Sequence, residues 1–242
     1  MNILKQIFIF SILFAPWNLS AQENLWYKKE LPAYTEYLAN DFGIIFNPIS
    51  NFTNLDKFYV LWSASKEPEK GAGSIYGPIF LSNNKDCMIM YNAQPNYVSK
   101  KEEVRLGMVN HNFHRSQITG EIRSALGLYF GHGNPLNKNN VETRFNDYVT
   151  IIAGKKPYEM FNADSIFIYD LPNADSVYFF DESLERIRKE KYPYCTGMFI
   201  TKNDRATMDI KLFFTKKGEK KKNQYVEMLY KSIWYNDKFH RD

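Results

Sequence analysis

Three histidines come nearest, by residue type and spacing, to a catalytic metal site. His111 and His114 are three positions apart, a spacing that puts both rings on one face of a helix. His132, between two glycines, could add a third zinc ligand and leave one coordination position open for water. The chain has no HExxH motif, however, and flanking glycines hold a ring poorly. The sequence pattern favours the interpretation that these are polar histidines that bind no metal. The alternative is a metal-assisted hydrolase that uses His111, His114 and His132 as ligands.

Other catalytic patterns are missing or have a plainer explanation. There is no G-x-S-x-G sequence around a serine. The stretch GHGNP at 131–135 lacks the third glycine of a dinucleotide loop, and its proline would stop the helix that such a loop must begin. Asp164, Asp170 and Asp175 could act as paired carboxylates, but their spacing fits no calcium loop and their neighbours are typical of turns. We therefore expect no catalytic residue and no cofactor.

A dense group of lysines is the candidate binding site. It consists of Lys216, Lys217, Lys220, Lys221 and Lys222. Such a cluster would suggest nucleic acid in a cytosolic protein, but the N-terminal segment described next indicates export and so excludes that partner. Anionic lipid headgroups and acidic glycans remain as ligand classes. The alternative is a solvated loop tip that keeps the neighbouring strands soluble.

The first 22 residues have the organisation of a secretory signal peptide. Lys5 supplies the positive charge, residues 7–17 form an apolar run too short to span a bilayer, and Ser20-Ala21-Gln22 offers small residues for cleavage. We expect a mature N-terminus at Gln22 or Glu23 and an exported protein, periplasmic or secreted. No later stretch of the sequence predicts a transmembrane helix.

Two cysteines, Cys87 and Cys195, fit two different arrangements. In an oxidising compartment they could form a disulfide that closes a long loop and stabilises the fold by about 4 kcal/mol in the entropic account. Alternatively, each is a separate buried thiol that packs as a small apolar group. Two cysteines carry no spacing signature, so the sequence leaves both arrangements open.

The elements that must position these residues are clearest near the C-terminus. Residues 207–214 alternate between apolar and polar side chains, which predicts a strand with one dry and one wet face in an antiparallel sheet. Residues 195–201 predict its partner strand, joined through a turn at 202–205. A helical stripe then follows, with Asn223 as its N-cap. The stripe consists of Val226, Leu229, Tyr230 and Ile233, and we expect it to pack on the sheet.

The rest of the chain predicts strands first and helices later. We expect a short helix at 33–38, a turn at 51–55, and strands at 43–46, 58–64, 74–81, 87–92 and 165–169. Helices are expected at 118–129, at 141–152 up to Lys155-Lys156-Pro157, and at 184–191 as a solvated helix or insertion. Segregated elements indicate an α+β fold, an antiparallel sheet with helices packed on it and a closing strand–strand–helix unit. Composition and length suit one such domain over residues 23–242.

The stretch FGIIFNPISNF at 42–52, followed much later by DIKLFFTKKG at 209–218 and a helix, resembles the PsbP-like α/β/α sandwich. Domains of that family open with a strand, a proline and an aromatic residue, and they close with a strand and a helix across an antiparallel sheet. The charged segment at 185–191 departs from this pattern. The ending of the chain is also similar to that of uncharacterised exported bacterial proteins, which implies a family and no activity.

Taken together, these residues favour a non-catalytic exported protein that binds an envelope or extracellular ligand. The metal-assisted hydrolase is the alternative, and metal analysis of the purified protein separates the two. The net charge of +4 is mild and by itself indicates no partner.

Overall fold

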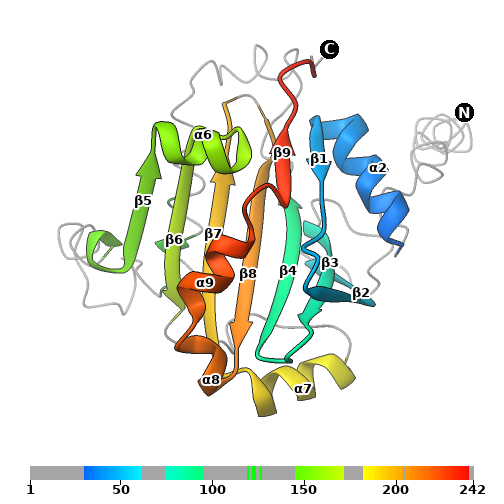
Figure 1. Ribbon diagram of the computed structural model, residues 1–242, viewed down its shortest axis with the longest axis vertical. Helices are drawn as coiled ribbons and strands as arrows, with labels where there is room; N and C mark the ends of the chain where they lie inside the picture. The colour runs from blue at the N-terminus through cyan, green and yellow to red at the C-terminus, as the bar shows by residue number, and fades with distance from the viewer. Residues whose placement is uncertain are drawn as a thin grey trace, which may run out of the picture.

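The computed structural model describes residues 30–61, 75–94, 119, 122–123, 126, 145–171, 182–203 and 205–239. Within these residues the chain forms a large antiparallel sheet with helices packed against it, so the predicted α+β class is confirmed (Figure 1). None of the described helices is long and apolar enough to cross a membrane.

The sheet has seven strands in the order β2-β3-β4-β8-β7-β6-β5, and each neighbouring pair is antiparallel. The strands are β2 (Phe52–Leu61), β3 (Ile75–Ser82), β4 (Cys87–Gln94), β5 (Val149–Ala153), β6 (Ser165–Leu171), β7 (Tyr194–Thr201) and β8 (Thr207–Phe214). A separate pair joins β1 (Ile44–Phe46) to β9 (Ile233–Tyr235). The helices are α2 (Leu31–Phe42), α6 (Lys155–Phe161), α7 (Glu182–Lys191), α8 (Lys216–Glu219) and α9 (Lys222–Met228).

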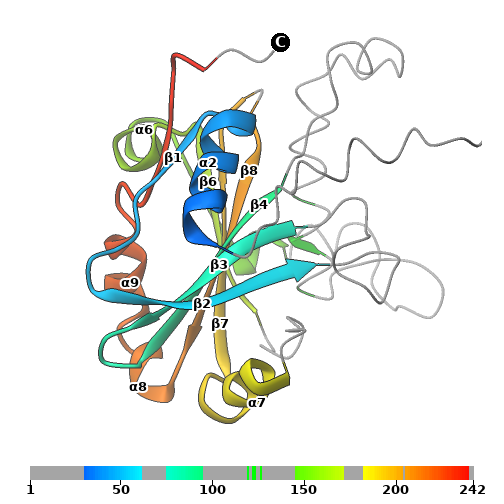
Figure 2. The same ribbon diagram turned by 90° about the vertical axis from the view of Figure 1, so that its right-hand side faces the viewer.

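One face of the sheet is covered by α2, α6, α9 and the β1–β9 pair (Figure 2). Helix α2 fits this place because Tyr34, Leu38 and Phe42 recur at four-residue spacing and are all buried. The Tyr34 hydroxyl also donates to the Tyr91 carbonyl at 2.7 Å, which ties the helix to β4. Gly43 ends α2 in the left-handed conformation, φ 62°, which glycine adopts without strain.

The opposite face has its own core cluster. Met90, Phe199 and Phe213 of the sheet pack there with Leu184 of α7 and with Phe145. The sheet is therefore buried on both sides along its central strands. The alternation in β8 predicted one wet face, and this was wrong, because all eight of its residues are buried.

The closing unit is confirmed in part. Strands β7 and β8 match their predicted ranges, but the helix ends at Met228, and Ile233 belongs to β9, where it pairs with Phe46. The chain reverses at residues 229–232, with Lys231 at φ 58°. Leu229 and Ile233 are nonetheless both buried in the core cluster that contains Ile210 and Leu212 of β8. The N-cap is Lys221, not Asn223.

Two boundaries in the middle of the chain differ from the prediction. Residues 145–148 are helical, but Val149 begins the edge strand β5, so the expected helix does not reach 152. Pro157 lies inside the first turn of α6, where backbone N–H groups have no helical partner, so it is tolerated and does not end a helix. The expected turn at 51–55 mostly belongs to β2.

Helix α7 is less solvated than its composition predicts. Leu184, Glu185 and Arg188 are buried, and Arg188 Nη2 lies 2.8 Å from Glu185 Oε1. The salt bridge explains how a strongly charged helix can bury one face.

Candidate functional site

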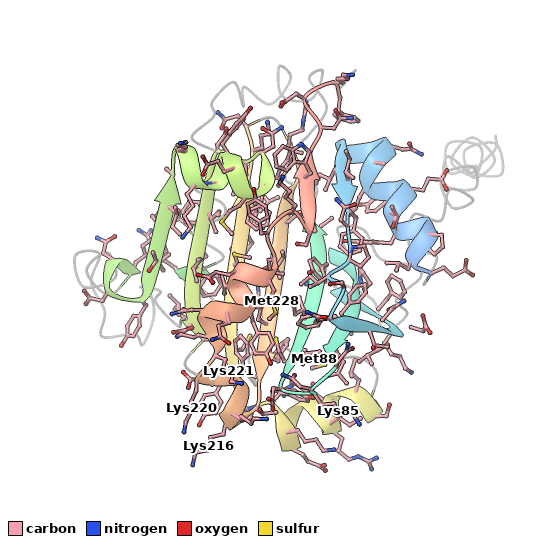
Figure 3. The ribbon with its side chains drawn as sticks, in the orientation of Figure 1. Lys85, Met88, Lys216, Lys220, Lys221 and Met228 are labelled. Atoms are coloured by element: carbon pink, nitrogen blue, oxygen red, sulfur yellow. The ribbon has the colours of Figure 1, made fainter. Side chains whose placement is uncertain are left out.

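The predicted lysine group lies at the end of the sheet where β8 stops (Figure 3). Helix α8, the turn at 220–221 and the start of α9 carry its members. Lys216, Lys220 and Lys221 are exposed, and in the part of the chain that the structure describes none of them forms an ion pair. These three side chains are therefore available to a ligand.

The other two lysines of the group have a structural role. Lys217 Nζ lies 3.1 Å from Asp86 Oδ2 in the β3–β4 turn, and Lys222 forms an ion pair with Asp170 of β6. Both contacts join residues far apart in the sequence. The structure thus divides the predicted five-lysine site into three lysines without an ion pair to a described residue and two that join the segment to the sheet.

Further contacts hold α8 firmly in place. The Thr215 amide donates to the Asp86 carbonyl at 3.1 Å, and the Gly218 amide donates to Thr215 Oγ1 at 3.0 Å as a helix cap. A Cβ on Gly218 would lie 2.0 Å from the Asp86 carbonyl oxygen, so only glycine permits this approach. The lysines therefore project from a fixed support.

A fourth exposed lysine, Lys85, belongs to the same end of the molecule (Figure 3). It lies in the β3–β4 turn next to Asp86, and its carbonyl accepts a hydrogen bond from the Tyr192 hydroxyl at 2.9 Å. We call Lys85, Lys216, Lys220 and Lys221 the basal lysine surface.

The spacing of these lysines carries an electrostatic cost. Lys216, the first residue of α8, and Lys220, its C-cap, are four positions apart. Like charges at this spacing on a helix repel each other by about 0.2–0.5 kcal/mol per pair. The arrangement does not serve stability, and an anion bound across it would relieve the repulsion.

A second charged site, which the sequence did not single out, lies inside the sheet. Asp209 and Lys211 of β8 form an ion pair. The exposed fraction of the surface is 5% for Asp209 and 7% for Lys211. The rings of Phe199 and Tyr169 lie 4.9 and 5.6 Å from Lys211 Nζ, within cation–π range. The cation is thus surrounded by one carboxylate and two aromatic rings.

Gly197 makes this arrangement possible. In the sheet register it lies between Tyr169 of β6 and Lys211 of β8. A Cβ on Gly197 would come within 2.3 Å of Tyr169 Cζ, so the missing side chain leaves room for the tyrosine ring to cross β7 toward the lysine.

The protonation states of this site are unsuited to catalysis at neutral pH. Burial disfavours the charged form of Lys211, but the Asp209 carboxylate outweighs burial and raises the pKa of Lys211 above its usual value. Burial also raises the pKa of Cys195 and of Tyr169, against the opposing effect of Lys211. An amine that stays protonated and a thiol that stays neutral are poor nucleophiles. The buried ion pair therefore keeps its charges inside the sheet, between one carboxylate and two rings.

The two cysteines are buried free thiols in the structure. Cys87 belongs to the core cluster under α2, α6 and α9, and Cys195 belongs to the cluster on the opposite face. Of the two arrangements that the sequence left open, the structure has the separate thiols.

The remaining candidate residues do not assemble a site in the described part of the chain. His111, His114, His132 and Asp175 lie outside the described residues. Asp170 accepts from Thr196 Oγ1 at 2.6 Å and pairs with Lys222, whereas Asp164 accepts from the Asn203 amide at 2.7 Å. No group of three His, Cys, Asp or Glu residues suited to a metal occurs among the residues that are described.

Comparison with protein-family models finds no match to this chain, and comparison with curated proteins finds none either.

Proposed function

We propose that this protein is a non-catalytic binding module, exported to the cell envelope or beyond, and that the basal lysine surface holds a polyanionic ligand. The observation that carries the proposal is the division of the lysines. Lys217 and Lys222 are paired with Asp86 and Asp170, whereas Lys216, Lys220 and Lys221 are exposed and form no ion pair with any described residue.

The fixed support strengthens this proposal. Helix α8 is held through Thr215 and Gly218 to the backbone of Asp86, so binding would order little main chain. A preorganised surface loses less entropy when it binds than a mobile loop does. The lysine side chains themselves must still be ordered, which favours a weak, reversible interaction that salt reduces.

The test measures binding of the mature protein to heparin, a soluble polyanion, over a series of salt concentrations. The variant carries Lys216→Gln, Lys220→Gln and Lys221→Gln. The control carries Lys155→Gln, Lys156→Gln and Lys238→Gln, which remove the same charge from the opposite end of the molecule (Figure 1). We expect the first variant to lose binding and the control to keep it. Equal behaviour of the two variants would refute a localised site.

Export has its own test. The apolar run at 7–17 and the small residues before Glu23 support cleavage at Gln22 or Glu23. N-terminal sequencing of the protein from its native host should find one of these two ends. A chain that retains Met1 in the cytoplasm would refute export.

A further inference from the structure

We infer that the partner of the basal lysine surface is an anionic lipid bilayer, and that the outer face of α7 lies against the bilayer together with the lysines. This inference rests on the proposed function and specifies which polyanion the lysines bind. Figures 1 and 2 show α7 and α8 at the same end of the molecule from two directions.

Two large apolar side chains are exposed at this end. Ile187, on the outer face of α7, is 40% exposed, and Tyr194, at the start of β7, is 41% exposed. Tyr194 pairs with Phe214, the last residue of β8, so it lies beside the segment that leads into α8. Tyr194 therefore adjoins the segment that carries the lysines, and Ile187 lies on α7 at the same end of the molecule.

Helix α7 adds further cations to the same end. Arg186, Lys189 and Lys191 are exposed, while Leu184 and Arg188 face the protein interior. Lys189 shares Glu185 with Arg188, and Glu190 is an exposed acid of this helix. The hydrogen bond from Tyr192 to the Lys85 carbonyl holds the end of α7 against the β3–β4 turn. Both groups of cations thus belong to one rigid end.

The mixture of side chains fits a bilayer better than a soluble polyanion. Cations near an anionic leaflet each gain about 1 kcal/mol, and isoleucine and tyrosine side chains are stabilised at the boundary between headgroups and acyl chains. An acidic glycan would pair with the lysines and leave Ile187 in water. The exposed apolar residues are therefore the feature that selects the membrane.

The experiment is co-sedimentation of the mature protein with vesicles of phosphatidylcholine and phosphatidylglycerol, with pure phosphatidylcholine vesicles as the reference. We expect binding to the anionic vesicles only. The triple Lys216→Gln, Lys220→Gln, Lys221→Gln variant should bind them roughly a hundredfold more weakly, about fivefold per lysine. The triple control at Lys155, Lys156 and Lys238 should bind as the wild type does.

A second variant separates the bilayer from other polyanions. Ile187→Ser should weaken vesicle binding by about fivefold or more and leave heparin binding unchanged, because only the membrane buries this side chain. Ile45→Ser is its matched control, since Ile45 is 44% exposed on β1, away from α7, and should change neither.

The other possible results of these binding experiments each overturn a different part of the proposal. Binding to heparin without binding to vesicles overturns the bilayer and keeps the proposed function. Absence of binding to both overturns both. Vesicle binding that Ile187→Ser leaves unchanged overturns the role assigned to α7.

Discussion

Lys211 and three lysines of the basal lysine surface lie within ten residues of one another in the chain and have opposite surroundings. Lys211 is buried beside Asp209, Tyr169 and Phe199, whereas Lys216, Lys220 and Lys221 project from α8 and the turn after it. A charge inside the sheet is retained only with a partner, since an unpaired buried charge is very costly. A charge at the end of the sheet keeps its water and remains available to a ligand. Burial therefore distinguishes Lys211 from the exposed lysines that we propose bind a ligand.

The largest effect should follow from breaking the buried pair. Asp209→Ala leaves Lys211 buried without its carboxylate, and we expect a loss of about 3–5 kcal/mol in the free energy of unfolding. Urea melts of the mature protein measure it. Replacing both partners, with Asp209→Val and Lys211→Met, should restore most of the stability because no charge is then buried alone. If the Asp209→Ala protein were as stable as the wild type, the ion pair would not be desolvated in the folded protein.

A smaller loss should follow from Gly197→Ala. The added methyl group would meet the ring of Tyr169 at 2.3 Å, and overpacking of this kind costs about 1–3 kcal/mol. In a Tyr169→Ala background the same change should cost much less, since the ring is gone. Denaturant melts of the four proteins form a double-mutant cycle. If Gly197→Ala lowered the free energy of unfolding equally in the wild type and in the Tyr169→Ala protein, the Tyr169 ring would not depend on the missing side chain of Gly197.

Stability should fall at alkaline pH. Burial raises the pKa of Cys87 and of Cys195, so the folded protein keeps two protons that the unfolded chain releases above about pH 8.5. Their stabilising contribution is complete below that pH and is lost as pH rises toward the folded pKa values, by up to about 1.4 kcal/mol per pH unit for each thiol. Melts between about pH 8 and 9.5 should show this slope. A Cys87→Ala, Cys195→Ala variant with the same slope would contradict it.

The smallest effect concerns the exposed lysines. Lys220→Gln should change the free energy of unfolding by less than about 0.5 kcal/mol, toward higher stability, because it removes the repulsion from Lys216. Lys155→Gln is the matched control, since Lys155 lies 3.2 Å from Glu159 and should lose a few tenths of a kcal/mol. Thermal melts at low salt compare the two. A clear loss in Lys220→Gln would assign that lysine a structural role.

Local patterns predicted much of this fold and none of its long-range pairing. The alternation in residues 207–214 identified β8, but it could not reveal that the polar face of that strand is also covered, because the cover comes from other parts of the chain. The stripe that includes Ile233 has helical spacing, yet pairing with Phe46 makes that residue part of a strand. A local pattern records which side of an element is buried and not which neighbour buries it.

The candidate site shows the same division. The lysine cluster was visible as a charge run, but the partners of Lys217 and Lys222 lie far away in sequence, in the β3–β4 turn and in β6. The sequence predicted that Asp209 and Lys211 lie on a solvated face of β8. The neighbouring strands β4 and β7 are largely apolar, and this was the sequence signal that could have indicated burial of the pair. The sequence could not indicate that Ile187 and Tyr194 lie at the same end of the molecule as the lysines, because the fold places α7 and α8 there.

The most direct measurement determines vesicle binding and unfolding free energy together for the Lys216→Gln, Lys220→Gln, Lys221→Gln protein. We predict that binding to phosphatidylglycerol vesicles is lost while the free energy of unfolding stays within about 1 kcal/mol of the wild type, since these exposed lysines form no ion pair with any residue that the structure describes. Unchanged binding, or a loss of binding that accompanies a large loss of stability, would contradict the assignment of these lysines to a ligand.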